Sequence, residues 1–303
     1  MSIRSTFVST FFLRPNKILY RLFHPSPGAI RFVIHPQTWF WGKLLSPFGV
    51  RLENSHYGNI PGVTFTPKKN TQPNIIFVYL HGGGYCIGSS RTTHRIGLAN
   101  LAKATSCIIH SIDYRLAPTH PYPAALDDAT EAWKAIVADN PESQIILSGD
   151  SAGGGLSLAL MMRLRDEGFR LPGAAVIFSP WADLTCSSKT YKTLAKADPM
   201  IPPTIPNHCA GHYVPDSVDR NNPYVSPIFG NFKGLPSTLI LVGGKEILLD
   251  DSRIVGEHAA AAGADFEVDI WPNMFHDWWL FGPFIPEAKQ CLLKVADWIH
   301  SRE

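Results

Sequence analysis

A serine flanked by glycines could act as a nucleophile in this 303-residue chain: Ser151 lies in the run Gly149-Asp150-Ser151-Ala152-Gly153. The apolar run 144–148 before it predicts a buried strand, and residues 154–162 after it predict a helix. A G-x-S-x-G sequence between a strand and a helix is typical of a tight turn that exposes the serine hydroxyl. Alone, the motif also fits a glycine-rich helix start, but the flanking elements favour the turn.

A second glycine motif, His81-Gly82-Gly83-Gly84-Tyr85, follows the strand-like run 74–80. When a serine attacks a carbonyl group, negative charge develops on the carbonyl oxygen, and backbone N–H groups stabilise it. Without side chains, Gly83 and Gly84 can bring their N–H groups close to that oxygen. Ala152, directly after the serine, would add a third donor. A phosphate-binding loop is disfavoured because no Gly-Lys-Ser/Thr follows the glycines.

A serine nucleophile also needs a base, and His276 is the best candidate among 12 histidines. It follows the strand-like run 266–270 and stands after Ser151 in the chain. The serine turn and the glycine loop resemble those of the α/β-hydrolase superfamily, and this resemblance implies the chain order serine, acid, histidine. His81, by contrast, is expected to be structural, since it lies before the serine and beside the glycine loop.

Together these motifs resemble those of the hormone-sensitive-lipase-like esterases, also called bacterial family IV, of the α/β-hydrolase superfamily. The resemblance spans roughly residues 70 to 300. Beyond the two glycine motifs, it rests on Asp113-Tyr114-Arg115-Leu116-Ala117-Pro118, on 122–128, on Ser179-Pro180-Trp181-Ala182-Asp183-Leu184-Thr185, and on the prolines and neighbouring residues of 222–236. It implies a serine esterase with an oxyanion hole formed by Gly83, Gly84 and Ala152.

The acid that orients the histidine departs from the family pattern. The family carries an aspartate in an Asp-Pro-Leu segment after its penultimate strand, and alignment of this region places Glu246 there. A glutamate carries the same charge and can accept the imidazole N–H. The alternative acids are Asp250 and Asp251, which we interpret instead as the start of the next helix, where carboxylates are favourable. Asp150, inside the serine motif, is left out of the triad.

The alternation of apolar strand-like runs with helical patterns predicts an α/β fold with a mostly parallel sheet covered on both faces. The resemblance makes this an α/β-hydrolase fold over residues 61–303 with an N-terminal helical cap over 1–60, to which about 189–224 contributes. No acidic residue precedes Glu53, and the segment before it is basic and apolar. Two other interpretations stay open: a basic amphipathic helix on a membrane surface, and an organellar presequence.

Composition limits the partners, cofactors and cellular locations that we expect for this protein. A net charge of +2 and the lack of a basic, aromatic-rich cluster argue against nucleic-acid binding. The 5 cysteines are an odd number, are scattered and lack metal-ligand spacing, which favours a reducing, cytoplasmic location. We therefore expect no metal, no cofactor and no membrane contact. A monomer and a homodimer are both left open.

The sequence thus predicts a serine carboxylesterase with Ser151 as nucleophile, His276 as base and Glu246 as orienting acid. Its substrates would be small-molecule carboxylic esters with short to medium acyl chains. Two alternatives use the same scaffold. One is a catalytically weak ligand-binding protein, which the presence of His276 argues against, and the other is an amidase or lipase with the same triad.

Overall fold

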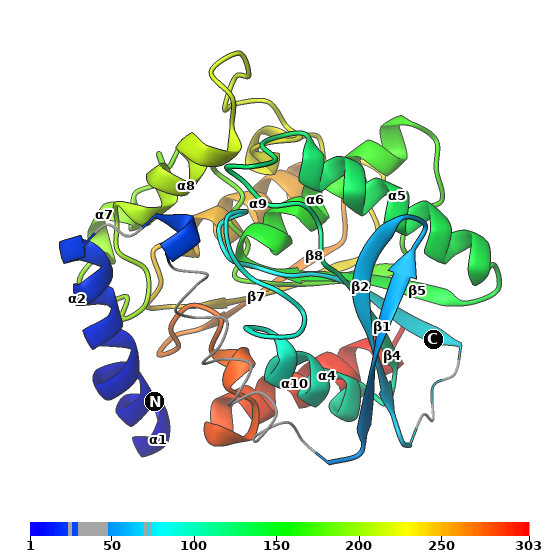
Figure 1. Cartoon of the computed structure of the whole chain (residues 1–303), viewed down its shortest axis with the longest axis horizontal. Coiled ribbons are helices and arrows are strands. Elements are labelled where there is room, and N and C mark those ends of the chain that lie inside the picture. The colour runs from blue at the N-terminus through cyan, green and yellow to red at the C-terminus, as the bar shows by residue number, and fades with distance from the viewer. Residues whose placement is uncertain (24–25, 30–47, 70–71, 73, 303) are drawn as a thin grey trace.

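The computed structural model describes residues 1–23, 26–29, 48–69, 72 and 74–302. Within them an eight-stranded sheet forms the centre, in the order β1-β2-β4-β3-β5-β6-β7-β8 (Figure 1). The strands are β1 Val50–Tyr57, β2 Ile60–Pro67, β3 Ile75–Leu80, β4 Ile108–Ile112, β5 Gln144–Asp150, β6 Ala174–Phe178, β7 Thr238–Gly243 and β8 Phe266–Trp271. Strands β3 to β8 are parallel, while β1 and β2 are antiparallel at one edge.

Helices cover both faces of this sheet. Figure 1 shows α4 and α10 on one face and α5, α6 and α9 on the other. The helices of the sheet domain are α4 Arg95–Thr105, α5 Ala124–Asp139, α6 Ser151–Asp166, α9 Leu249–Ala261 and α10 Pro286–His300, with short 3₁₀ turns η2 Pro227–Phe229 and η3 Trp278–Phe284. The predicted mostly parallel sheet flanked by helices is therefore confirmed.

The strands bury side chains on both faces, which explains their nearly continuous apolar sequences. Ile145 and Leu147 pack in the cluster that contains α5, α6 and α9, whereas Ile146 packs in the cluster that contains α4 and α10. Successive side chains of a strand point to opposite faces, so a strand between two layers of helices has no polar face. The same two layers fix the carboxyl ends of the parallel strands, where the loops with the candidate residues begin.

Outside the sheet, two segments far apart in sequence meet. The chain begins with α1 Ile3–Phe7, the π-helix η1 Val8–Leu13 and α2 Arg14–Phe23, and the predicted irregular stretch contains α7 Thr190–Thr193 and α8 Ile205–Tyr213. Lys17 Nζ donates to the carbonyl oxygens of Ala195 at 2.7 Å and Asp198 at 2.5 Å. Thus α2 is fastened to the segment between α7 and α8.

The segment 1–60, assigned to the cap from the sequence, has three parts in the structure. Helices α1, η1 and α2 extend to Phe23, residues 27–29 are also helical, and β1, from Val50, belongs to the sheet. Residues 30–47 lie outside the described residues. None of the described helices is both long and apolar enough to cross a membrane.

Candidate active site

Ser151 lies at the sharp turn between β5 and α6. Its φ is +53°, a left-handed conformation that non-glycine residues rarely adopt. The turn is so tight that a Cβ atom on Gly153 would lie 2.0 Å from the carbonyl oxygen of Leu80. The Ser151 carbonyl accepts a hydrogen bond from the N–H of Trp181 at 2.8 Å, which ties the turn to the loop after β6. A strained, over-determined backbone of this kind is typical of a nucleophile turn.

The glycine loop after β3 presents backbone donors beside this turn. Gly83 has φ +118°, and a Cβ there would meet the carbonyl oxygen of Ile87 at 2.2 Å. Within the part of the chain that the structure describes, the N–H groups of Gly83 and Gly84 donate to no other group. Ala152 lies in the first turn of α6, where N–H groups have no intrahelical acceptor. These three donors are therefore available to an anionic oxygen.

Asp150 anchors the glycine loop to the serine turn. Its Oδ1 accepts hydrogen bonds from the Gly82 N–H at 2.9 Å and from the hydroxyl of Tyr79, and its Oδ2 lies 3.0 Å from Nε2 of His94. Burial raises the pKa of Asp150, but the charge of His94 and hydrogen bonds from His94, Tyr79 and Asp277 bring it down to about 2. The sequence placed Asp150 outside the triad and gave no sign of this anchoring role.

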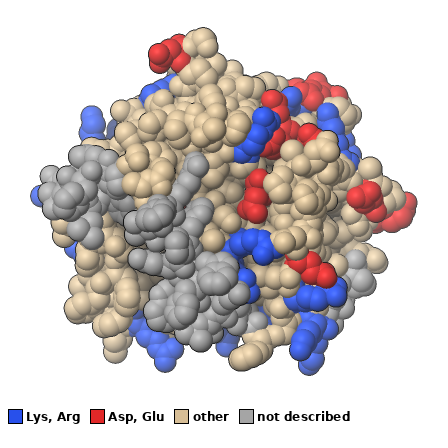
Figure 2. Space-filling model, viewed as in Figure 1, with Lys and Arg blue, Asp and Glu red and all other residues tan. Residues whose placement is uncertain are grey.

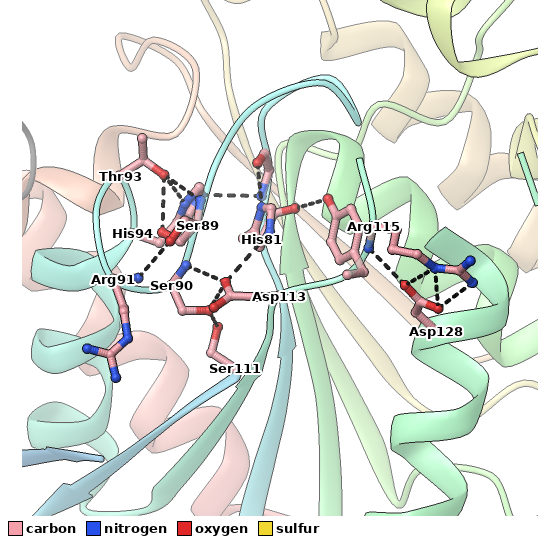
Figure 3. A network of polar contacts seen from close by, with 12 residues as sticks. His81, Ser89, Ser90, Arg91, Thr93, His94, Ser111, Asp113, Arg115 and Asp128 are labelled. Carbon is pink, nitrogen blue, oxygen red and sulfur yellow. Dashed lines mark hydrogen bonds and ion pairs between the residues drawn. The ribbon is translucent and has the colours of Figure 1, made fainter. Parts of the chain in front are cut away.

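The motif 113–118 also contacts this loop, and Figure 3 shows its Asp113 beside His81 and Ser90. Tyr114 stacks on the ring of His81 with centroids 4.4 Å apart and donates its hydroxyl to the His81 carbonyl at 2.5 Å. Asp113 accepts from the N–H and hydroxyl of Ser90, both at 2.8 Å. Arg115 forms a salt bridge with Asp128, with Nη2 and Oδ1 2.6 Å apart. His81 is thus packed as part of a framework that fixes the loop.

Glu246 and His276 meet between the loops after β7 and β8. Nδ1 of His276 lies 2.6 Å from Oε2 of Glu246. The other carboxylate oxygen accepts from the hydroxyl of Ser179 at 2.8 Å and from the Gly243 N–H at 2.7 Å. Glu246 is fully buried, so this carboxylate is not a surface group. Its contacts orient the imidazole in the way that a triad acid requires.

The alternative acids lie elsewhere, in the first turn of α9 as expected. Oδ2 of Asp251 accepts from the N–H groups of Ala182 and Asp183, each at 3.0 Å. Asp250 accepts from the N–H of Thr190 at 3.2 Å. The structure therefore brings Glu246, and not these aspartates, to His276. Asp251 also does more than favour the helix dipole, because it holds the loop after β6.

Asp277 is a contact of His276 that the sequence did not single out. Its Oδ2 lies 2.9 Å from Nε2 of His276. Burial lowers the pKa of His276, but the charge of Asp277 and the hydrogen bonds that the ring donates to Asp277 and Glu246 raise it well above its usual value. Adjacency to the candidate base was the only signal in the sequence. Among the described residues, no group of three or more His, Cys, Asp or Glu side chains is arranged so that it could hold a metal ion.

Comparisons with known proteins identify the family of the chain. The family of the alpha/beta hydrolase fold matches residues 77–280. An acetyl-hydrolase of Streptomyces hygroscopicus is 37% identical over 222 residues, which cover 73% of this chain and 74% of the relative. An esterase of Acinetobacter venetianus is 36% identical over 235 residues, 77% of each chain.

Solved structures of esterases are similar to this chain over nearly its whole length. The crystal structure of an esterase from the bacterial hormone-sensitive lipase family superposes with a TM-score of 0.89 at 32% identity, covering 100% of this chain and 99% of that one. Fold, family match and relatives agree with one another. The chain belongs to the α/β-hydrolase family, among the hormone-sensitive-lipase-like esterases, and it is a carboxylic ester hydrolase.

Proposed function

We propose that Ser151, His276 and Glu246 form the catalytic triad of this carboxylesterase. The observation that carries the proposal is the 2.6 Å contact between Glu246 and Nδ1 of His276. The loop after β6 links this pair to the strained turn, because its Ser179 donates to Glu246 and its Trp181 N–H donates to the carbonyl of Ser151. A carboxylate at Nδ1 holds a proton there and leaves Nε2 as the nitrogen that acts as base. All three residues follow the carboxyl ends of parallel strands, so they lie at one edge of the sheet.

The reaction then takes two steps. His276 accepts the hydroxyl proton of Ser151 while Oγ bonds to the ester carbonyl carbon, and the tetrahedral intermediate collapses as the protonated imidazole gives its proton to the leaving alcohol. Water next attacks the acyl-enzyme with His276 as base, and the carboxylic acid leaves as Ser151 regains its proton. In both steps the N–H groups of Gly83, Gly84 and Ala152 would hold the carbonyl oxygen as it becomes negative.

Substrate size is proposed to be set by a cap made of the N-terminal helices and the segment with α7 and α8. Tyr213 of α8 stacks on Tyr85 of the glycine loop, with ring centroids 3.8 Å apart. Lys17 ties α2 to the same segment through two carbonyl oxygens. A covered site favours short to medium acyl chains, and the name of the acetyl-hydrolase relative supports a short acyl group.

A panel of p-nitrophenyl esters of increasing acyl length tests both parts. We expect kcat/KM to be highest for short to medium chains and to fall for long ones, with no rise on emulsified triglyceride. In the same assay Ser151→Ala should lower kcat by at least about 10⁴-fold, because the nucleophile is lost. Near-normal turnover by folded Ser151→Ala would overturn the triad, and fast turnover of emulsified long-chain lipid would identify a lipase instead.

The remaining predictions concern the setting of the enzyme. The five cysteines all lie in the described part of the chain and form no disulfide with one another, which supports the proposed cytoplasmic location. Basic and acidic side chains lie interspersed on the face shown in Figure 2, as expected for a protein with no polyanionic partner. A monomer or a homodimer, without membrane contact, stays a prediction that size-exclusion chromatography with light scattering can test.

A further inference from the structure

The carboxyl group of Asp277 engages the nitrogen of His276 that must accept the proton of Ser151. Oδ2 of Asp277 lies 2.9 Å from Nε2, and only 3% of the residue is exposed. Its backbone is left-handed, with φ +51° and ψ +37°, a conformation that aspartate adopts more readily than most residues. The proposed mechanism has no use for this carboxyl group, yet a buried charge beside the base must change how the base titrates.

Asp277 also faces Asp150, the aspartate that anchors the glycine loop. Within the described part of the chain, no N–H or O–H group donates to the buried Oδ1 of Asp277. A hydrogen bond from Asp277 is one of the influences that lower the pKa of Asp150. Burial raises the pKa of Asp277 itself to about 8; the charge of His276 opposes this rise and that of Asp150 adds to it. Two adjacent buried carboxyl groups share a proton because they would repel each other if both were ionised.

We propose that Asp277 is a positioning residue: in the resting enzyme its carboxyl group holds a proton and bridges His276 and Asp150. The imidazolium of His276 then donates Nδ1–H to Glu246 and Nε2–H to Asp277, and the protonated carboxyl group of Asp277 donates to Asp150. The inference rests on the proposed function, because it requires His276 to be the base.

This arrangement makes activity depend on pH. With a proton on Nε2, His276 cannot accept the proton of Ser151. As the pH rises, Asp277 ionises, and its negative charge then retains the proton on Nε2. The base is free only after that second proton has left to water. The acidic limb of kcat/KM should therefore have a midpoint above the usual histidine pKa of about 6.5.

Other titratable groups surround His276 and Asp277 and come from several elements. They are Glu246 after β7, Asp150 at the end of β5, Tyr79 on β3, His94 before α4 and Asp198 between α7 and α8. Asp277 is the carboxyl group in contact with Nε2, and its charge has the largest raising effect on the pKa of His276. Removing its ionisation should therefore move the limb more than a change at a distant carboxylate.

Asp277→Asn is the matched test, because the amide keeps the shape and both hydrogen bonds. Its oxygen can accept Nε2–H and its NH₂ group can donate to Asp150, but it cannot ionise. We expect the midpoint of the acidic limb to fall by at least about one pH unit. We divide kcat/KM of each protein by its own plateau value. At a pH well below both midpoints, this ratio should be about tenfold higher in Asp277→Asn than in the wild type. Asp250→Asn, on α9, is the control and should leave the midpoint unmoved.

The outcomes separate this inference from the proposed function. A lowered midpoint in Asp277→Asn with an unmoved Asp250→Asn supports the role of Asp277, and an unmoved midpoint in folded Asp277→Asn overturns it. If His276→Ala keeps wild-type turnover, the proposed function fails instead. Should Asp277→Asn not fold, ¹⁵N NMR of wild-type His276 decides: protonated Nε2 at pH 7 supports the inference, and unprotonated Nε2 overturns it.

Discussion

At the scale of single residues, Glu246 shows how a longer acid can fill the place of an aspartate. Its extra methylene adds a rotatable bond, and its orientation would be less certain if the carboxylate were free. Ser179 and the Gly243 N–H hold one oxygen, at 2.8 and 2.7 Å, so the other is presented to His276 in a fixed direction. Two clamping hydrogen bonds therefore offset the freedom of the longer side chain.

Glu246→Gln tests this clamp and the charge together. The amide keeps the length but can present an N–H to Nδ1 and so favour the wrong imidazole tautomer. We expect kcat to fall by at least about 100-fold, toward the ~10⁴-fold loss seen when a triad acid is changed to its amide. Asp250→Asn should leave kcat near wild type. Steady-state kinetics at one alkaline pH, with circular dichroism to check folding, measures both variants.

Asp251→Asn should differ from both of these variants. Asp251 is fully buried; its Oδ2 accepts two backbone N–H groups after β6 and its Oδ1 accepts from the hydroxyl of Ser188 at 3.2 Å, so an amide, with one acceptor oxygen, cannot satisfy both sets of donors. An unsatisfied buried group of this kind costs about 1–3 kcal/mol of stability. Chemical denaturation should show that loss. A fall in kcat as large as that of Glu246→Gln, without a loss of stability, would contradict this division of roles.

At the scale of elements, the contact of β1 and β2 with β4 contains a half-buried histidine, His110. Nδ1 of His110 lies 3.2 Å from the hydroxyl oxygens of both Tyr57 and Thr64. Burial lowers the pKa of His110 to about 4, with the charge of Asp139 opposing that shift. In the unfolded chain the pKa is about 6.5. The folded state therefore binds fewer protons between these values, and stability falls as the pH falls from about 6.5 to 4.

His110→Phe should flatten this part of the stability curve. At pH 5 the wild type should have lost up to about 2 kcal/mol through this histidine alone, relative to pH 7. Urea unfolding at pH 7 and at pH 5 measures the difference for each protein. The control is His300→Gln, at the exposed end of α10, which should keep the wild-type difference. An equal pH dependence in His110→Phe and the wild type would show that His110 is accessible to protons in the folded state.

The N-terminal helices form a second contact between elements that can be tested. If they belong to the cap, deletion of residues 1–23 removes the Lys17 bonds to the carbonyl oxygens of Ala195 and Asp198. We expect the shortened protein to lose activity or to aggregate, because part of the site and some apolar surface become exposed. Lys17→Met, with a similar stem but no charge, isolates the two bonds. Full activity and solubility after the deletion would reject the cap.

At the scale of the whole molecule, the parallel core could be predicted from the sequence because its signals are local. Strand β3 is apolar throughout, β5 and β7 contain the apolar runs 145–147 and 239–242, and glycines mark the turns that follow β3 and β5. Strand β1 was missed because it carries Arg51, Glu53 and Asn54 at an exposed sheet edge, so no apolar run marks it. Edge strands of this kind resemble polar loops in sequence.

Site residues could be predicted where they stand in a local sequence motif, and could not be predicted where their role depends on a residue far away in the sequence. Ser151 and His276 stand in motifs whose order along the chain suggests their chemistry. Asp277 gave no such signal, because its contacts with His276 and Asp150 arise only when β8 and β5 are both in place. Long-range pairs of this kind need the three-dimensional structure.

The position of β8 has a consequence for how the enzyme loses activity in denaturant. Within the described residues, β8 is the last strand of the sheet and pairs only with β7. It is mostly half-buried, and Lys294 of α10 bonds to its Asp269 at 2.8 Å. His276 follows this strand, so partial opening of the edge would separate the histidine from Glu246 while the rest of the sheet stayed folded.

Activity should therefore disappear at a lower urea concentration than far-UV circular dichroism. Lys294→Met, which removes a link between α10 and β8, should widen the gap between the two midpoints. Coincident midpoints in both proteins would mean that β8 unfolds only with the whole domain. If the gap is found, ester turnover reports the docking of one terminal strand, and a preparation can retain nearly all of its secondary structure and still be inactive.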